Sequence, residues 1–324
     1  MRHLYLRRLV APVYMQPIID KIDPALIKAE LTPDRLLRRS NKGDNEIYVV
    51  DAFNAPNTMR EIGRLREISF RDAGGGTGKD CDIDEFDTMD VPCRQMIVWN
   101  PEGEEIIGGY RFILGEDIKM DCGVPRIATS HMFRFSDRFL KEYLPNTIEL
   151  GRSFVVVDYQ TTQDRRERPK AIYALDNLWD GLGALTVKYP QIKHLFGKVT
   201  MYPNYGPECR DLILAFMHKH FPDPDQLVTP ITPLVCNADK PEVTSLLSGA
   251  DFKEDLRIVN SFVRSHGTRI PPLVNAYMAL SPTMRMFGTA INPEFGDVEE
   301  SGIFLTISEI FQAKKERHID TFSL

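Results

Sequence analysis

The pattern of hydrophobic and polar positions predicts strands and helices in alternation from about residue 46 onwards. Runs of hydrophobic residues predict strands at 46–51, 95–99, 105–114, 148–157, 194–201, 286–291 and 302–307. Hydrophobic residues at helical spacing predict helices at 58–70, 171–189, 209–221, 252–266 and 271–280. A turn of hairpin length at 101–103 joins two of the strands, which are therefore expected to be antiparallel.

This order of elements predicts an α+β fold, with a mixed and mostly antiparallel central sheet flanked by helices. A doubly wound parallel sheet is disfavoured, because a hairpin joins the early strands. Residues 1–44 predict a separate helical extension, with helix starts near Pro24 and at 32–34. Residues 45–324 predict one further domain that carries a proline-rich and helical insertion at about 222–270.

The predicted second helix of the extension carries a group of basic residues. Arg35, Arg38 and Arg39 lie beside Leu36 and Leu37. They form either a solvated basic face or a surface for an acidic partner or anionic lipid.

Composition and charge exclude several classes of protein. The chain has 324 residues, of which 43% are hydrophobic and 27% charged, so it can build a core of its own. Its net charge of −6 argues against a protein that grips nucleic acid with its whole surface. The five cysteines form no C-x-x-C pair and the histidines show no metal-binding spacing, so we expect no bound metal and a reducing compartment. Neither a signal segment nor a stretch of about 20 apolar residues is visible, which predicts a cytoplasmic protein with at most peripheral membrane contact at the inner face.

The glycine-rich segment from Gly74 to Lys79 resembles a phosphate-binding loop but lacks two of its required residues. Ala73 stands at the position of the first glycine, and Asp80 stands where serine or threonine would follow the lysine. No predicted strand precedes the segment. We interpret it as a loop next to a site.

Charged residues interrupt the hydrophobic pattern at three places in the first half of the chain. Arg66 and Phe70 are four residues apart and therefore share a helix face. Arg111 lies inside a hydrophobic strand, where a buried guanidinium needs carboxylate partners, and Asp84 and Asp87 are the candidates. The group is either a structural ion-pair network or the wall of a polar substrate pocket, and the two roles are compatible.

A fourth charged pair, Glu149 and Arg152, stands at the start of the strand 148–157. In a regular strand these two side chains would point to opposite faces of the sheet. Gly151 between them would allow a β-bulge, and bulges redirect side chains near active sites.

Taken in their order along the chain, these residues resemble the signature of acyl-homoserine-lactone synthases: Arg66 with Phe70, Asp84 with Asp87, Gly109-Tyr110-Arg111, and Glu149 with Arg152. The resemblance to the related ornithine-lipid and glycine-lipid N-acyltransferases, sometimes labelled hemolysin-like, is closer. It includes the segments 61–67, 82–87, 149–154, 194–199 and 271–277. It covers roughly residues 45–310 and implies a GNAT-like acyltransferase fold.

The resemblance implies that a fatty acyl group, typically 3-hydroxylated, moves from acyl carrier protein to the α-amine of a small amino acid such as glycine or ornithine. That reaction is the first step of amino-acid lipid synthesis. Glu149 would be the general base, with Arg152 beside it in the catalytic site. Arg111 or Arg152 would bind the carboxylate of the amino acid. The resemblance extends the substrate-binding set to Arg66, Phe70, Asp84 and Asp87, of which the two aspartates would hold that arginine or bind the ammonium group.

On the donor side, the resemblance implies an acyl-phosphopantetheine thioester and no permanently bound cofactor. A backbone N–H near Phe154 or Val155 would polarise the thioester carbonyl. The loop 160–169 lacks the glycines of a coenzyme A-binding loop, which favours acyl carrier protein as the donor. Basic residues around this loop would meet the acidic carrier protein or are simply solvated: Arg165, Arg166, Arg168 and Lys170. An apolar slot for the acyl chain would be lined by Tyr110, Phe112, Phe133, Phe154 and Phe196.

Three alternatives stay open at this point. The first is an acyl-coenzyme A-dependent acetyltransferase that acts on a polar amine. The second is signal synthesis from S-adenosylmethionine. The third is a non-catalytic, membrane-active protein of the hemolysin-like kind.

Overall fold

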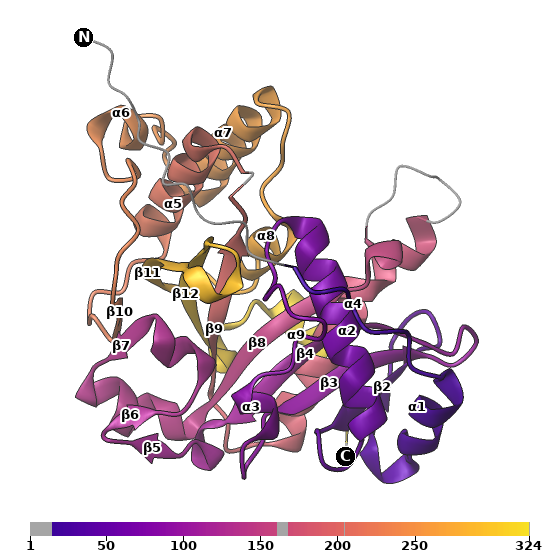
Figure 1. The fold of residues 1–324 in the computed structure, drawn as a ribbon. Helices are drawn as coiled ribbons and strands as arrows, with labels where there is room; N and C mark the ends of the chain where they lie inside the picture. The colour runs from indigo at the N-terminus through magenta and orange to yellow at the C-terminus, as the bar shows by residue number, and fades with distance from the viewer. Residues whose placement is uncertain (1–14, 161–167, 204, 324) are drawn as a thin grey trace.

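An eight-stranded sheet lies at the centre of the part of the chain that the computed structural model describes, namely residues 15–160, 168–203 and 205–323. The strand order is β1-β2-β3-β4-β8-β9-β12-β11 (Figure 1). The bounds of these strands are β1 Leu36–Arg39, β2 Glu46–Val50, β3 Arg94–Asn100, β4 Glu105–Leu114, β8 Thr147–Val155, β9 His194–Met201, β11 Arg285–Asn292 and β12 Val298–Thr306. Among the described pairs in this sheet, β8 with β9 is parallel and the others are antiparallel.

Two small antiparallel sheets stand beside the main one. They pair β5 (Met120–Asp121) with β6 (Val124–Pro125), and β7 (Phe133–Phe135) with β10 (Val228–Pro230). The mostly antiparallel α+β fold that the sequence predicted is confirmed.

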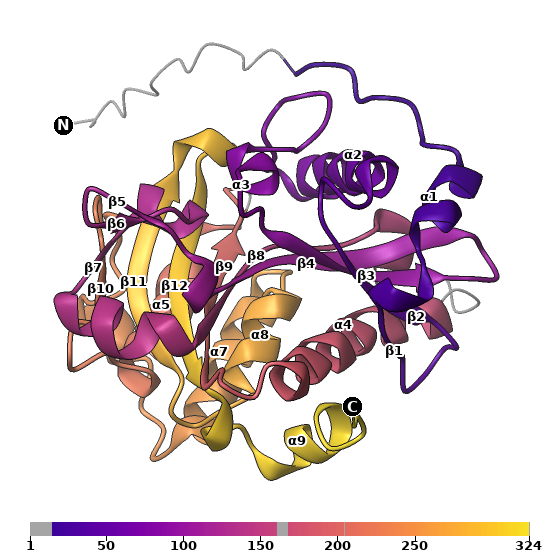
Figure 2. The ribbon, with the colours of Figure 1, turned by 90° about the horizontal axis from the view of Figure 1, so that it is seen from below.

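Helices cover both faces of the main sheet. Their bounds are α1 Pro24–Glu30, α2 Pro56–Ala73, α3 Glu85–Thr88, α4 Arg168–Lys188, α5 Pro207–His220, α6 Pro241–Thr244, α7 Phe252–Ser265, α8 Pro272–Met278 and α9 Gln312–His318. Figure 2 shows α2 and α3 on one face, called here the α2 face, and α4, α8 and α9 on the other, called the α4 face. Successive strand residues alternate between these faces: Ile97 and Trp99 of β3 pack with α2, whereas Met96 and Val98 pack with α4.

Residues at the ends of α2 and α1 explain where these helices begin and end. Pro56 occupies the first turn of α2, where its missing N–H costs nothing. Gly74 ends the helix in the left-handed region at φ 96°, a conformation that glycine adopts without steric cost. Asp23 caps α1 by accepting a hydrogen bond from the backbone N–H of Ala25.

The N-terminal segment differs from its predicted structure after residue 35. Residues 36–39, expected to be helical, form β1, an edge strand that pairs with β2. Leu37 packs in the same core as Ile47, and Arg38 is buried, with its guanidinium donating to the Arg39 carbonyl and to Asn41. The expectations of a second helix and of a basic helix face were therefore wrong, because core packing outweighed the local helix signal. The main sheet thus begins before residue 45.

The C-terminal helix α9 was not predicted from the sequence, and it packs against α4. In the proposed insertion at about 222–270, the structure has α6, α7 and the short strand β10.

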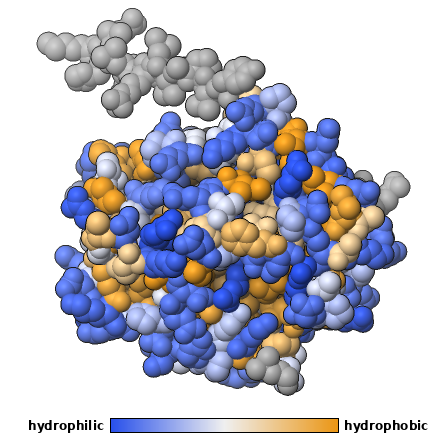
Figure 3. All heavy atoms as spheres, turned by 60° about the horizontal axis from the view of Figure 1, so that its bottom comes forward, coloured by the Kyte–Doolittle hydropathy of each residue, from blue (hydrophilic) through white to orange (hydrophobic). Residues whose placement is uncertain are grey.

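No described helix is both long and apolar enough to cross a membrane. On the face shown in Figure 3, hydrophobic residues are interspersed with hydrophilic ones.

Candidate active site

The two parallel strands β8 and β9 separate in the middle of the sheet. Their ladder pairs Thr147–Leu150 with His194–Gly197 and then ends. Beyond this point β8 stays paired with β4, and β9 stays paired with β12. A cavity of about 500 Å³, called here the cleft, opens along the gap. It is lined from the α4 face by residues such as Tyr110, Leu150 and Tyr277, and from the α2 face by Phe70, Phe154 and Phe295.

A β-bulge in β8 lies at this separation. Gly109 pairs with Phe154 and Arg111 pairs with Gly151, so two residues of β8 stand opposite one residue of β4. The extra residue reverses the alternation of side-chain direction along β8. Glu149 and Arg152 therefore point to the same face of the sheet. The predicted bulge is confirmed. The residue of the bulge in the left-handed region is Arg152, at φ 47°, and Gly151 does not have a positive φ.

The glycine pair before Tyr110 permits the close contact between β4 and its neighbours. A Cβ atom on Gly108 would lie 2.5 Å from the carbonyl oxygen of Phe154, and one on Gly109 would lie 2.8 Å from that of Met96. Any larger residue at position 108 would push β8 away at the bulge.

Three arginines and three aspartates form one ion-pair network on the α2 face beside the bulge. Its members, called here the arginine–aspartate network, are Arg66, Arg111, Arg152, Asp82, Asp84 and Asp87. Arg111 Nη1 lies 2.6 Å from Asp84 Oδ1 and 3.3 Å from Asp87 Oδ2, and Arg152 Nε lies 2.9 Å from Asp82 Oδ2. The predicted contact between Arg111 and the two aspartates is confirmed.

The chain between Asp84 and Asp87 is held by its own hydrogen bonds as well as by the arginines. Asp84 caps α3 by accepting from the N–H groups of Phe86 and Asp87, and the Asp87 carboxylate accepts from the N–H of Asp84. The guanidinium of Arg111 and the neighbouring arginines hold the pKa of Asp84 well below its usual range, although burial opposes them. Asp84 therefore stays ionised.

The glycine-rich loop binds a carboxylate of the protein itself. The N–H groups of Thr77 and Gly78 and the Thr77 hydroxyl all donate to Glu67 of α2, at 3.1, 2.8 and 2.7 Å. Arg71 also donates to Glu67, at 2.7 Å. The hydrogen-bond donors that a phosphate-binding loop would offer to a nucleotide are thus occupied.

A second cavity, called here the polar pocket, has a volume of about 490 Å³. Its lining includes Thr77 and Lys79 of the glycine-rich loop, Asp84, and His131. Three residues line both this pocket and the cleft: Arg152, Lys198 and Phe295. The two cavities therefore lie next to each other at the bulge, beside the arginine–aspartate network, and the place of the three shared residues is called here the meeting point.

Lys198 and Glu300 form a buried ion pair at this meeting point, between the neighbouring strands β9 and β12. Burial lowers the pKa of Lys198, and the charge of Glu300 opposes that shift. Tyr202 also lines the cleft, and burial together with the Glu300 charge raises its pKa to about 12. Lys198, Glu300 and Tyr202 were missed in the sequence analysis. Lys198 carried a usable signal, since it is a charged residue inside a hydrophobic strand, as Arg111 is.

Glu149 is buried and lines neither of the two cavities. Its Oε1 atom and the Thr129 hydroxyl are both buried without a well-formed hydrogen bond to the described residues. Burial raises the pKa of Glu149, while the positive charges of Arg111 and Lys198 act in the opposite direction. The carboxyl therefore ionises less readily than an exposed one.

The remaining predicted site residues separate into three groups. Phe70, Phe154 and Val155 line the cleft, whereas Arg66 and Arg111 are buried in the network and line neither cavity. Arg165 and Arg166 lie outside the described residues, and Arg168 and Lys170 stand in the first turn of α4, where only the backbone is described. Of the five aromatic residues expected to form an apolar slot, two line the cleft, Tyr110 and Phe154, and three belong to the core, Phe112, Phe133 and Phe196.

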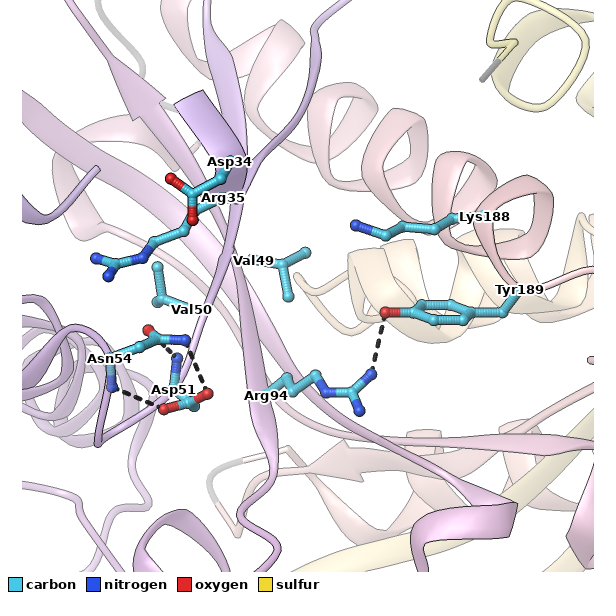
Figure 4. Close-up of a pocket in the computed structure, with 9 residues that line it drawn as sticks. All are labelled: Asp34, Arg35, Val49, Val50, Asp51, Asn54, Arg94, Lys188 and Tyr189. Atoms are coloured by element: carbon cyan, nitrogen blue, oxygen red, sulfur yellow. Dashed lines mark hydrogen bonds between the residues drawn. The ribbon is translucent and has the colours of Figure 1, made fainter. Parts of the chain in front are cut away.

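A third cavity, of about 320 Å³, lies between β2, the start of β3 and the end of α4. Figure 4 shows that several of its polar groups bind one another: Arg94 donates to the Tyr189 hydroxyl, and Asn54 bonds with Asp51. Arg94 also pairs with Asp117. This mutual pairing makes the third cavity a weaker candidate than the meeting point at the bulge.

Comparisons of the sequence with known proteins point to one class of enzyme, the acyltransferases. A family described as acetyltransferase (GNAT) domain matches residues 65–165. The glycine N(alpha)-acyltransferase of Bacteroides thetaiotaomicron is 60% identical over 309 residues, which cover 95% of this chain and 91% of that protein. The protein of the same description from Phocaeicola vulgatus is 58% identical over 309 residues, or 95% and 94% of the two chains. A crystal structure of TofI in a ternary complex with an inhibitor and MTA aligns with a TM-score of 0.39 and 10% identity, over 83% of this chain and 96% of that one.

The buried carboxyl of Glu149 predicts a pH-dependent stability difference for Glu149→Gln. A carboxyl whose pKa is raised in the folded state contributes stability below about pH 4.3, where an exposed glutamate is protonated, and that contribution is lost as the pH rises through the raised pKa. Glutamine does not titrate, so the variant should gain stability relative to the wild type as the pH rises. Chemical unfolding of both proteins between about pH 4 and pH 8 measures this.

Glu142→Gln is the control, because it removes an exposed carboxylate and should change the free energy of unfolding by less than about 0.5 kcal/mol. The prediction would be contradicted if Glu149→Gln lost stability relative to the wild type as the pH rises. Such a loss would mean that Arg111 and Lys198 stabilise the ionised form more than burial disfavours it.

Proposed function

Because the chain belongs to the family of the glycine N(alpha)-acyltransferases, we propose that it transfers a fatty acyl group from acyl carrier protein to the amine of glycine. The chain is an acyltransferase with a GNAT domain, in agreement with the sequence resemblance. The proposal adds the donor, the acceptor and a place at the first step of amino-acid lipid synthesis. Glycine is preferred to ornithine because both relatives are described as acting on glycine.

The meeting of the cleft and the polar pocket at Arg152, Lys198 and Phe295 carries this proposal. Aminolysis of a thioester requires two substrates of different character to come within bonding distance. The cleft offers an apolar wall, which includes Leu150 and Leu273, to a thioester with a long chain. The polar pocket offers charged groups to an amino acid, and the reaction would take place where the two cavities join.

The reaction itself sets the demands on these residues. The ammonium group of the acceptor loses one proton, and its nitrogen then forms a bond with the thioester carbon. The carbon–sulfur bond breaks, the departing thiolate takes up a proton, and the amide keeps one N–H, so one proton is released per turnover. Negative charge develops on the carbonyl oxygen, and a backbone N–H at Phe154 or Val155, beside the bulge, is our candidate for its stabilisation.

Arg152 is the better candidate of the two arginines for binding the acceptor carboxylate. Arg111 is only 1% exposed and its guanidinium is engaged with Asp84 and Asp87. Arg152 lines both cavities while Asp82 and Asp84 hold its position. A guanidinium held in this way can still bind a carboxylate through its remaining N–H groups.

Glu149 remains our proposal for the general base, and its raised pKa suits that role. Since it lines neither cavity, it would act through a water molecule or through a movement of the neighbouring side chains. Glu300 is the alternative base, because it lines the cleft directly and pairs with Lys198.

The acidic partner that we propose is acyl carrier protein, with the phosphopantetheine arm entering the cleft. The support is the absence of the coenzyme A-type glycines from the loop 160–169 and the basic residues around it. Because the product is amphiphilic, we also propose that the protein works in peripheral contact with the inner face of the membrane.

A reconstituted reaction tests the proposed function. Purified protein is incubated with acyl carrier protein loaded with a 3-hydroxy fatty acyl group and with glycine, and parallel reactions contain ornithine or the matching coenzyme A ester. We expect N-acylglycine by mass spectrometry and an equal amount of free thiol. Failure to acylate any small amino acid would reject the proposal. Product formed with the coenzyme A ester but not with acyl carrier protein would reject acyl carrier protein as the donor.

Arg152→Lys tests the binding of the acceptor carboxylate. Lysine keeps the charge but loses the two-pronged geometry, so the KM for glycine should rise about tenfold or more while kcat changes less. The control is Arg138→Lys, at an exposed ion pair that lines neither the cleft nor the polar pocket. An unchanged KM for glycine would move the carboxylate-binding role to another cation.

Glu149→Gln and Glu300→Gln together identify the general base. If Glu149 is the base, its glutamine variant should lose roughly 100-fold or more in kcat and also lose the fall in activity at acidic pH. The Glu300 variant should keep the fall in activity at acidic pH. The opposite result, in which only Glu300→Gln lacks that fall in activity, would assign the base to Glu300.

A further inference from the structure

Phe295 is the apolar member of the three residues shared by the cleft and the polar pocket. It ends the short turn Pro293–Phe295 between β11 and β12, and it is 4% exposed. The other two residues at the meeting point, Arg152 and Lys198, are both charged. A large, uncharged ring therefore stands at the place where the two substrates of the proposed reaction would meet.

The ring of Phe295 is held from two sides. The guanidinium of Arg152 lies over the ring, 4.6 Å from its centroid. Phe70 of α2 packs edge-on against the ring, with centroids 4.9 Å apart and planes at 68°. Rotation of the ring away from the meeting point would lose both contacts.

The backbone of the turn is held by the glycine-rich loop. Gly296 follows the turn at φ 82°, and a Cβ atom on it would lie 3.2 Å from the Cα of Gly75. A Cβ atom on Gly75 would lie 3.3 Å from the carbonyl oxygen of Phe295. The two glycines thus allow the loop and the turn to touch backbone to backbone, and the turn has no room to move toward the loop. The glycine-rich loop therefore supports the turn that carries Phe295.

We propose that Phe295 determines acceptor specificity, because its ring occupies the space that a side chain on the acceptor α-carbon would need. This inference rests on the proposed function. If Arg152 binds the acceptor carboxylate and the amine points into the cleft, the α-carbon lies between the two, beside the ring stacked on that same arginine. An α-carbon with two hydrogens fits against the ring, and a methyl or larger group collides with it.

The test measures kcat/KM for glycine, L-alanine and L-serine with one acyl donor, in the wild type, Phe295→Leu and Phe295→Ala. The ratio of alanine to glycine should rise at least about tenfold in Phe295→Leu, and further in Phe295→Ala, where serine should also become a substrate. Phe287→Leu is the matched control, since Phe287 is equally buried but lines neither cavity. Its ratio should equal that of the wild type.

An unchanged ratio in both Phe295 variants, with glycine activity reduced or intact, would overturn the inference and leave Phe295 a packing residue. Melting temperatures show whether a variant is folded, and the milder Phe295→Leu answers the question if Phe295→Ala does not fold. A wild-type protein without activity on glycine rejects the proposed function, and this inference with it. A wild type active on glycine with unaltered ratios in the variants rejects this inference alone.

Discussion

Arg66, Arg111 and Arg152 bring three positive charges into a region shielded from water, where Asp82, Asp84 and Asp87 bring three negative ones. Buried charges are tolerated only when they are paired, and removal of one partner from such a pair costs about 3–5 kcal/mol. The pairing therefore ties α2, the segment 82–87, β4 and β8 together at one point. That point is also where β8 and β9 separate, so the edge of the cleft is built on buried and paired charges.

The arginines of this network differ in how far their side chains are exposed, and therefore in whether they can contact a ligand. The side chains of Arg66 and Arg111 are 0% and 2% exposed, whereas that of Arg152 is 12% exposed and lines both cavities. The difference comes from the bulge, which places Arg152 at positive φ and turns it toward the aspartates at the rim. A residue in this conformation is strained, and the ion pairs to Asp82 and Asp84 offset that strain. One arginine of a structural network is thereby left in reach of a ligand.

Much of this arrangement was visible in the sequence for identifiable reasons. Alternating and helically spaced hydrophobic residues indicated the strands and helices, and charged residues inside such runs indicated Arg111 as part of an ion-pair network and Glu149 as a candidate site residue. The segment Leu36–Arg39 was assigned wrongly, because its local pattern suits a helix while the open edge of β2 and the core around Leu37 favour a strand. Phe295 and Glu300 carried no local signal, since an aromatic residue in a turn and a carboxylate in a strand have many ordinary uses.

The sequence by itself determined the α+β class, the order of the main strands and helices from residue 46 to residue 307, the bulge between Glu149 and Arg152, and the acyltransferase family. All of these depend on residues close together in the chain or on an ordered set of motifs. Tertiary structure alone decided that the glycine-rich loop binds Glu67 and supports Phe295, that Arg152 rather than Arg111 reaches a cavity, and that Glu149 is buried outside both cavities. The physical reason is that burial and pairing are properties of distant segments brought together. Whether a charged side chain is structural or free to meet a ligand depends on which partners the fold places around it, and no local pattern contains that information.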